Sequence, residues 1–160
     1  ADTLEWRTGN VARVAMLIGD APPHNVGLEK AFDASLGLRS KGVRLYALAA
    51  SGIKDVAEYM MRLMAFVTGG RYMWLTDDSQ IGDPHAEPRV ACYHVTHLDN
   101  LLNRVLLSEV TGQRVEPDPA DIIREEGTPE NGICLIDLND VEGSLLTTAG
   151  NGGTSSGGGG

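Results

Sequence analysis

The chain has 160 residues and a formal net charge of −9 at pH 7, and 42% of its residues are hydrophobic. This size and composition are typical of one globular domain with an appendage. The acidic balance argues against nucleic acid as a partner, because a phosphate backbone requires a basic surface. No apolar run approaches the roughly 20 residues that a membrane-spanning helix needs. Residues 1–10 also lack the pattern of a secretory signal. Neither observation assigns a compartment.

The stretch from Val11 to His24 (VARVAMLIGDAPPH) organises the rest of the chain. Its apolar part, residues 11–18, has the near-continuous hydrophobicity of a strand that is buried on both faces of a parallel sheet. Asp20 follows directly, and Pro22-Pro23 prevents an immediate helical continuation. Open α/β sheets bind ligands at the carboxyl ends of their strands, so Asp20 is a candidate site residue. The alternative is that Asp20 only caps or turns the chain.

Helices and strands then alternate along the chain. Hydrophobic periodicity predicts a helix over 26–40, a strand over 43–50, a helix over 55–68, a strand over 71–75 and a helix over 98–111. The predicted helix starts are Asn25, the pair Asp55 and Glu58, and the pair Thr96 and Asp99. On the second helix, a stripe from Val56 to Val67 is expected to face the sheet. This order predicts a doubly wound, Rossmann-like parallel α/β sheet.

The C-terminal part differs in composition. Residues 113–142 form an acidic, proline-rich extension with a predicted short helix at 121–126 and a predicted strand at 133–138, and residues 143–160 form a flexible Gly/Ser-rich tail. The predicted α/β domain therefore covers residues 1–112. Cys92 and Cys134 are 42 positions apart and outside any CxxC pair, which excludes a cysteine-type zinc site. They can form one disulfide or remain two buried thiols, and we slightly favour thiols.

Oxygen-bearing side chains follow each of the three predicted strands: Asp20, then Ser51, then Thr76-Asp77-Asp78. Oxygen ligands suit Mg²⁺, Mn²⁺ or Ca²⁺. A divalent cation needs several oxygens around one ion, whereas neighbouring strands lie about 5 Å apart. Asp20 alone therefore has a convincing position.

The histidines offer a weaker metal site. His24 and His85 lie in loops at the same rim and could approach each other, whereas His94 and His97 flank a helix start and are expected to cap or pack. No nucleophile–base pair is visible, so we expect a protein that is not an enzyme. A metal-assisted hydrolase that uses Asp20, His24 and residues 77–87 is the remote alternative.

Two segments, AMLIGDAPPH and GVRLYALAASGIKDVAEYMMRLMAFVTGGRYMWLT, resemble the C-terminal half of bacterial von Willebrand factor type A domains. The resemblance covers about residues 4–111. It implies a doubly wound α/β fold and a non-enzymatic protein-binding module with a metal-ion-dependent adhesion site. It also implies that Asp20 is a ligand of Mg²⁺ or Mn²⁺, directly or through water, and that the protein partner presents an acidic side chain.

The resemblance begins at the family's fourth strand. The family's DxSxS loop, its threonine loop and its first three strands have no counterpart in this sequence. The strand at 11–18 would then be an exposed apolar edge. Three completions stay open: an N-terminal half on a separate polypeptide, a homo-oligomer through this edge, or residues 133–138 as a substitute strand. The alternative function is accordingly a metal-independent assembly element that is completed by edge-strand pairing.

Overall fold

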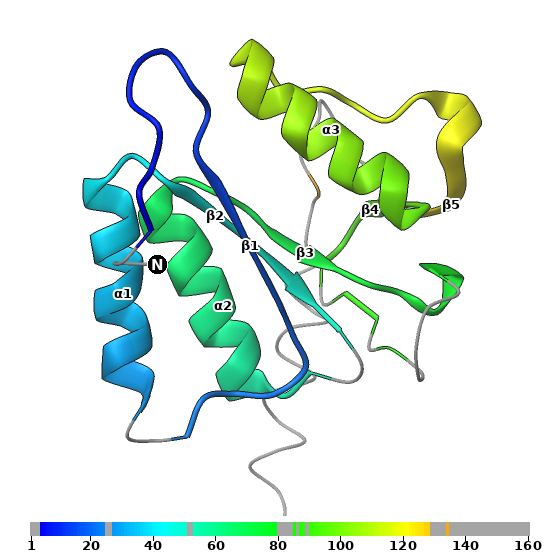
Figure 1. Cartoon of the computed structure of the whole chain (residues 1–160). Helices are drawn as coiled ribbons and strands as arrows, with labels where there is room; N and C mark the ends of the chain where they lie inside the picture. Colours follow the sequence, from blue (N-terminus) through cyan, green and yellow to red (C-terminus); the bar gives the residue numbers. More distant parts are fainter. Residues whose placement is uncertain are drawn as a thin grey trace, which may run out of the picture. The chain divides into compact units, whose positions relative to one another are not determined.

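The computed structural model describes residues 4–24, 27–50, 53–79, 85, 87–88, 90–128 and 134. Contacts group the chain into two units, the first with residues 1–89 and 94–125 and the second with residues 90–93 and 126–160. The first unit is mixed α/β with a parallel sheet, compatible with a Rossmann-like fold (Figure 1). The predicted fold class is confirmed at this level.

A three-stranded parallel sheet forms the centre of the first unit, in the order β1 (Val14–Gly19), β2 (Arg44–Ala49), β3 (Tyr72–Trp74). β1 pairs with β2 from Val14 opposite Arg44 to Gly19 opposite Ala49, and β2 pairs with β3 from Ala47 opposite Tyr72 to Ala49 opposite Trp74. β2 is therefore the central strand.

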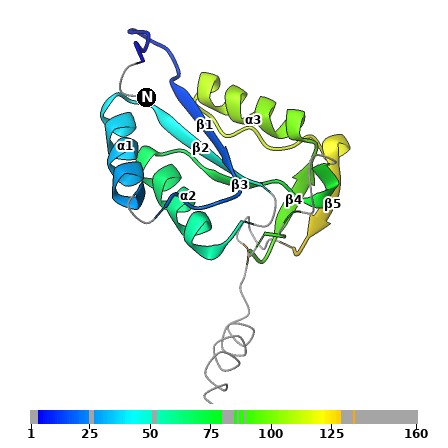
Figure 2. The same cartoon turned by 60° about the horizontal axis from the view of Figure 1, so that its bottom comes forward.

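Helices cover both faces of this sheet (Figures 1 and 2). α1 (Leu28–Ser40) and α2 (Asp55–Thr68) lie on one face, and α3 (Leu98–Thr111) lies on the other. Successive side chains of β2 point to opposite faces, so β2 contributes to two cores. Its alternate residues Leu45 and Ala47 pack with α1 and α2, whereas Tyr46 packs with Val105 of α3.

β1 is less buried than its apolar sequence predicted. Among the described residues it pairs with β2 alone, and Met16 and Ile18 are 38% and 60% exposed. Ala15 and Leu17, which point to the other face, pack against the core that α1 and α2 cover. The expectation of burial on both faces is wrong because the core that α1 and α2 cover buries only the face of Ala15 and Leu17, whereas the face of Met16 and Ile18 stays exposed. Separately, β1 has a paired strand on one edge only. An exposed apolar edge, as the family resemblance implied, is what the described residues show.

α2 has the predicted bounds, but its start and its buried face differ from prediction. Asp55 is the first helical residue and Lys54 is the cap position, where no side chain bonds to the helix end. Glu58 instead pairs with Arg62 one turn later (2.6 Å). Val56 is exposed, because the buried stripe runs through the residues Ala57, Met60, Met61, Met64, Ala65 and Thr68.

The other predicted helix starts also differ. α1 follows Gly27, which makes no side-chain cap, and Asn25 lies outside the described residues. α3 follows His97, likewise without a side-chain cap, so Thr96 does not cap this helix. The hydroxyl of Thr96 accepts a hydrogen bond from Arg104 instead (3.3 Å).

A second sheet of two strands was not predicted. It contains β4 (Tyr93–Thr96), which lies shortly before α3, and β5 (Ile122–Glu126), which follows a short 3-10 helix at Pro119–Asp121. The predicted helix over 121–126 is wrong. Ile122–Glu126 alternates half-buried and exposed side chains, which is the period of a strand.

Within the second unit, Cys92 and Cys134 form a disulfide with their Cα atoms 5.5 Å apart. The preference for free thiols is therefore wrong. Gly127 adopts a positive φ of 63° and lies so close to Ala91 that a Cβ would overlap the Ala91 carbonyl oxygen. Apart from Cys134, the predicted strand at 133–138 lies outside the described residues, as does the tail from residue 143.

The turn between α2 and β3 requires two glycines. Gly69 has a φ of 76°, and the amide of Gly70 donates to the carbonyl of Ala65 at the helix end (2.9 Å). A Cβ on Gly70 would overlap the backbone carbonyl of Leu45 in β2. Gly70 therefore permits the close approach of this turn to the central strand.

We expect Gly70→Ala to lower the free energy of unfolding by about 1–3 kcal/mol, because the new methyl group must displace the backbone of β2. Urea denaturation measures the change. Gly19→Ala is the matched control, because a Cβ there meets nothing within 4 Å. Equal stability of the two variants would contradict the close-approach argument.

Candidate functional site

Asp20 is exposed at the carboxyl end of β1, where the sequence placed it. β1 is held there by β2, since the carbonyl of Gly19 accepts the amide of Ala50 (3.0 Å). No described residue forms a hydrogen bond or an ion pair with the Asp20 carboxylate. Asp20 can therefore offer both carboxylate oxygens to a ligand at the rim of the sheet.

The acidic residues after β3 are engaged elsewhere. The Oδ1 atom of Asp77 accepts the backbone N–H of His85 (2.7 Å). The Oδ2 atom of Asp78 accepts Nε of Arg124 in β5 (3.0 Å), and the same guanidinium pairs with Glu87 (3.1 Å). Arg124 neutralises Asp78 and Glu87, which makes these two carboxylates poor candidates for a shared metal site. Ser51, the predicted oxygen donor after β2, lies outside the described residues.

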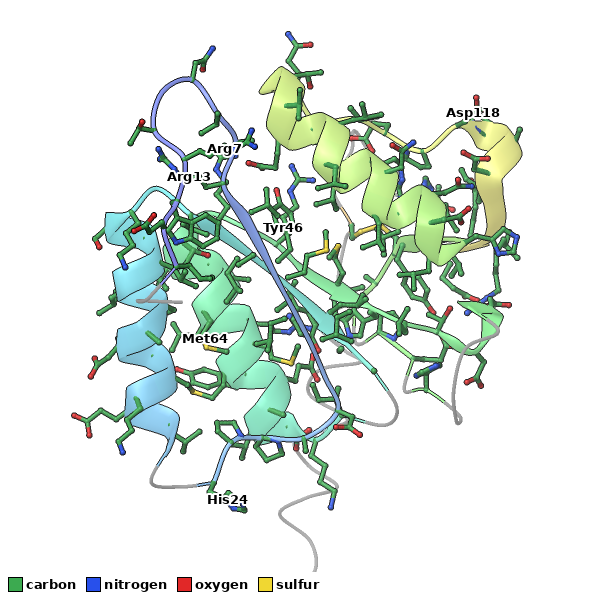
Figure 3. All side chains as sticks on the ribbon, viewed as in Figure 1. Arg7, Arg13, His24, Tyr46, Met64 and Asp118 are labelled. Carbon is green, nitrogen blue, oxygen red and sulfur yellow. A yellow bond between two sulfur atoms is a disulfide. The ribbon has the colours of Figure 1, made fainter. Side chains whose placement is uncertain are left out.

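The structure does not bring the histidines together with Asp20 into a metal site. Figure 3 shows His24 in the loop after β1 with its side chain directed away from the sheet, and His24 is exposed. His94 lies in β4, where its Nε2 atom is 3.6 Å from Glu125 of β5. Among the described residues, no three His, Cys, Asp or Glu side chains are grouped to hold a metal ion. Asp20 could contribute one ligand to a cation whose other ligands come from elsewhere.

A polar network on the α3 face, buried at Tyr46 and exposed at Arg44, was not predicted from the sequence. The Tyr46 hydroxyl donates to the Oε1 atom of Glu109 in α3, and Arg44 donates to the same oxygen (2.9 Å). Burial is the largest cause that raises the pKa of Tyr46 to about 12, and the hydrogen bond to Glu109 is the second. The hydrogen bond to Glu109 raises the pKa of Arg44. Arg44 and Tyr46 are 65 and 63 positions from Glu109 in the chain, so no local pattern reveals the network.

Comparisons with known proteins give no assignment: no family model, curated protein or solved structure matches the chain. Within the described residues, no helix is long and apolar enough to cross a membrane.

We expect Tyr46→Phe to lower the free energy of unfolding by about 1–2 kcal/mol at pH 7, because Glu109 loses a buried hydrogen-bond donor. The neutral phenol contributes stability that is complete below pH 10 and is lost as the pH rises toward 12, since its pKa is raised in the fold. The stability difference between the wild type and the variant should therefore shrink between pH 10 and 12.

Denaturant unfolding at pH 7, 9 and 11 measures this difference. The exposed Tyr59 is the control, because Tyr59→Phe should leave the stability unchanged at each pH. A difference between wild type and Tyr46→Phe that is the same at pH 7 and pH 11 would contradict the raised pKa.

Proposed function

We propose that this protein is a non-enzymatic, protein-binding module of the von Willebrand factor A type that binds through a divalent cation. The single observation that carries the proposal is the exposed Asp20 carboxylate at the carboxyl end of β1, unoccupied by any described residue. In the family, an aspartate after the corresponding strand belongs to the adhesion site. The strand order β1-β2-β3 is compatible with the second half of that fold.

The chemistry of the site follows from its ligands. Mg²⁺ and Mn²⁺ prefer oxygen ligands in octahedral geometry, and one carboxylate leaves most positions to water and to other groups. A cation with open positions attracts an acidic side chain even on a chain with net charge −9. The partner in this proposal is therefore a protein with an exposed Asp or Glu, and further ligands come from a polypeptide that completes the domain.

The metal proposal is testable on this chain alone with paramagnetic Mn²⁺ as the probe. Titration with MnCl₂, followed by two-dimensional NMR, should broaden the amide signals of Gly19 and Ala21 before those of the sheet core. Asp20→Asn should remove this selective broadening. Asp33→Asn, which changes an exposed carboxylate on α1, should leave it intact. Broadening centred elsewhere, or unchanged in Asp20→Asn, would sink the assignment.

A second candidate function is metal-independent assembly, and the open edge of β1 favours it. β1 carries no charged residue, and charges are a usual protection of edge strands against pairing. Arg13 precedes the strand and Asp20 follows it. In an antiparallel pair of two β1 strands, the positive end of each strand lies beside the negative end of the other. The occupant that this arrangement fits is a second copy of the chain.

A cavity behind β1 extends the same apolar surface. It has a volume of about 470 Å³ and lies between Ala15 and Leu17 of β1, Ala31 of α1, and Met60 and Met64 of α2. Small and flexible side chains line it, so it can accept side chains from an added strand. The cavity and the edge together supply apolar area for a partner that pairs with β1.

For assembly through β1, we expect sedimentation velocity at micromolar concentrations to show a dimer. Ile18→Lys should raise the dissociation constant by at least about tenfold, because a charge would be placed within the pairing edge. Phe66→Lys is the matched control, since Phe66 is 81% exposed on α2, away from this edge. A well-folded monomer in the wild type would exclude the assembly function.

A further inference from the structure

A second cavity lies on the opposite face of the sheet from the cavity behind β1. It has a volume of about 170 Å³ and lies between α3 and the sheet. Tyr46 of β2, Arg71 immediately before β3, and Arg104 and Ser108 of α3 line it, together with Arg114. Figure 3 shows Tyr46 between β2 and α3. Three arginines thus surround one small cavity in a chain with net charge −9.

Arg104 lines this cavity, and one of its hydrogen-bond donors has no acceptor among the described residues. One terminal nitrogen donates to the Thr96 hydroxyl (3.3 Å), but Nε is buried and has no acceptor among the described residues. Burial lowers the pKa of the Arg104 guanidinium below its ordinary value. A buried donor without an acceptor costs about 1–3 kcal/mol, and more if it is charged. Nε itself is enclosed, so an acceptor in the cavity would be held by the terminal N–H groups of Arg104.

Of the three arginines that line the cavity, only Arg114 forms an ion pair with a described residue. Glu109 is already shared by Tyr46 and Arg44. Glu116 forms an exposed ion pair with Arg114. Arg71 forms no ion pair with any described residue. The guanidinium groups of Arg71 and Arg104 therefore form no ion pair within the described part of the chain, and the charges of Glu116 and Asp121 reach Arg104 only from a longer distance.

Hydroxyl groups of the cavity are not free to donate. Ser108 donates its proton to the backbone carbonyl of Arg104 (2.7 Å) and accepts the amide of Val115 (2.9 Å). Tyr46 donates its proton to Glu109. The donors that remain for a ligand are guanidinium N–H groups, which suit an acceptor with several oxygens and negative charge.

We propose that this cavity binds a small oxyanion of the phosphate class, either inorganic phosphate or the phosphate group of a monoester. One guanidinium group can bind two phosphate oxygens at once, through two parallel charge-assisted hydrogen bonds. The cavity is several times larger than the roughly 30 Å³ of one water and smaller than the roughly 300 Å³ of sites for drug-sized ligands. It therefore has room for the anion but not for a large organic group. Any ester group must extend past the exposed Arg71 and Arg114.

This site is independent of the proposed cation site. Arg71 and Tyr46 lie near the amino ends of β3 and β2, whereas Asp20 follows the carboxyl end of β1. In a parallel sheet these ends are opposite. The two sites carry opposite charge, so each can be removed without changing the ligand preference of the other.

Isothermal titration with sodium phosphate, at an ionic strength held constant with sodium chloride, tests the proposal. We expect saturable 1:1 binding that is weakened at least about tenfold by Arg104→Gln and by Arg71→Gln. Arg39→Gln is the matched control, because Arg39 is an exposed arginine on α1, on the other face of the sheet. Arg71 is exposed, so its replacement is compatible with folding, and circular dichroism verifies this for each variant.

Two further arms define the ligand class. O-phosphoserine should bind with the same dependence on Arg104 if a monoester is accommodated, whereas inorganic phosphate alone would restrict the site to the free anion. Acetate should bind at least about tenfold more weakly than phosphate, because it carries one charge and two oxygens. The proposal is overturned if neither phosphate compound binds, if acetate binds equally well, or if Arg104→Gln and Arg71→Gln bind phosphate as the wild type does.

Discussion

The central position of β2 is the constraint on which the first unit depends. Among the described strands, β2 alone has hydrogen-bonded neighbours on both sides, and its last five residues are buried. A buried backbone amide must find an acceptor. Near the start of β2, the amide of Leu45 finds the hydroxyl of Thr68, which in turn donates to the carbonyl of Met64 (2.9 Å). β2 thereby positions α2 and both outer strands. Asp20 follows one of these outer strands, β1, and Tyr46 lies on β2 itself.

Both proposed ligand sites are places where a charge lacks compensation within the described chain. Asp78 and Glu87 are neutralised by Arg124, whereas Asp20 has no such partner among the described residues. On the α3 face, Glu109 is satisfied by Tyr46 and Arg44, whereas Arg104 retains an unmet donor. The paired charges connect secondary-structure elements to one another. The charges without a partner are the ones on which both ligand proposals rest.

The sequence predicted the elements that its own periodicity determines. α2 has its predicted bounds because a strong helical pattern ends at Gly69. The apolar run at 11–18 could not show whether one face of β1 is covered or both, because such a run is compatible with either arrangement. β5 was taken for a helix, because the pairing with β4 is a non-local contact. Arg124 lies 46 positions from Asp78, so the neutralisation of that carboxylate, and with it the isolation of Asp20, could not be predicted from spacing.

The disulfide between Cys92 and Cys134 closes a covalent ring that includes α3 and β5. A single cut of the backbone anywhere inside this ring leaves both products joined through the sulfur bridge. α3, which supplies Arg104 and Glu109, is therefore tethered at both of its ends by covalent bonds. Separating the two products requires a reductant in addition to the cut, so after such a cut the disulfide alone keeps this helix attached to both parts of the chain.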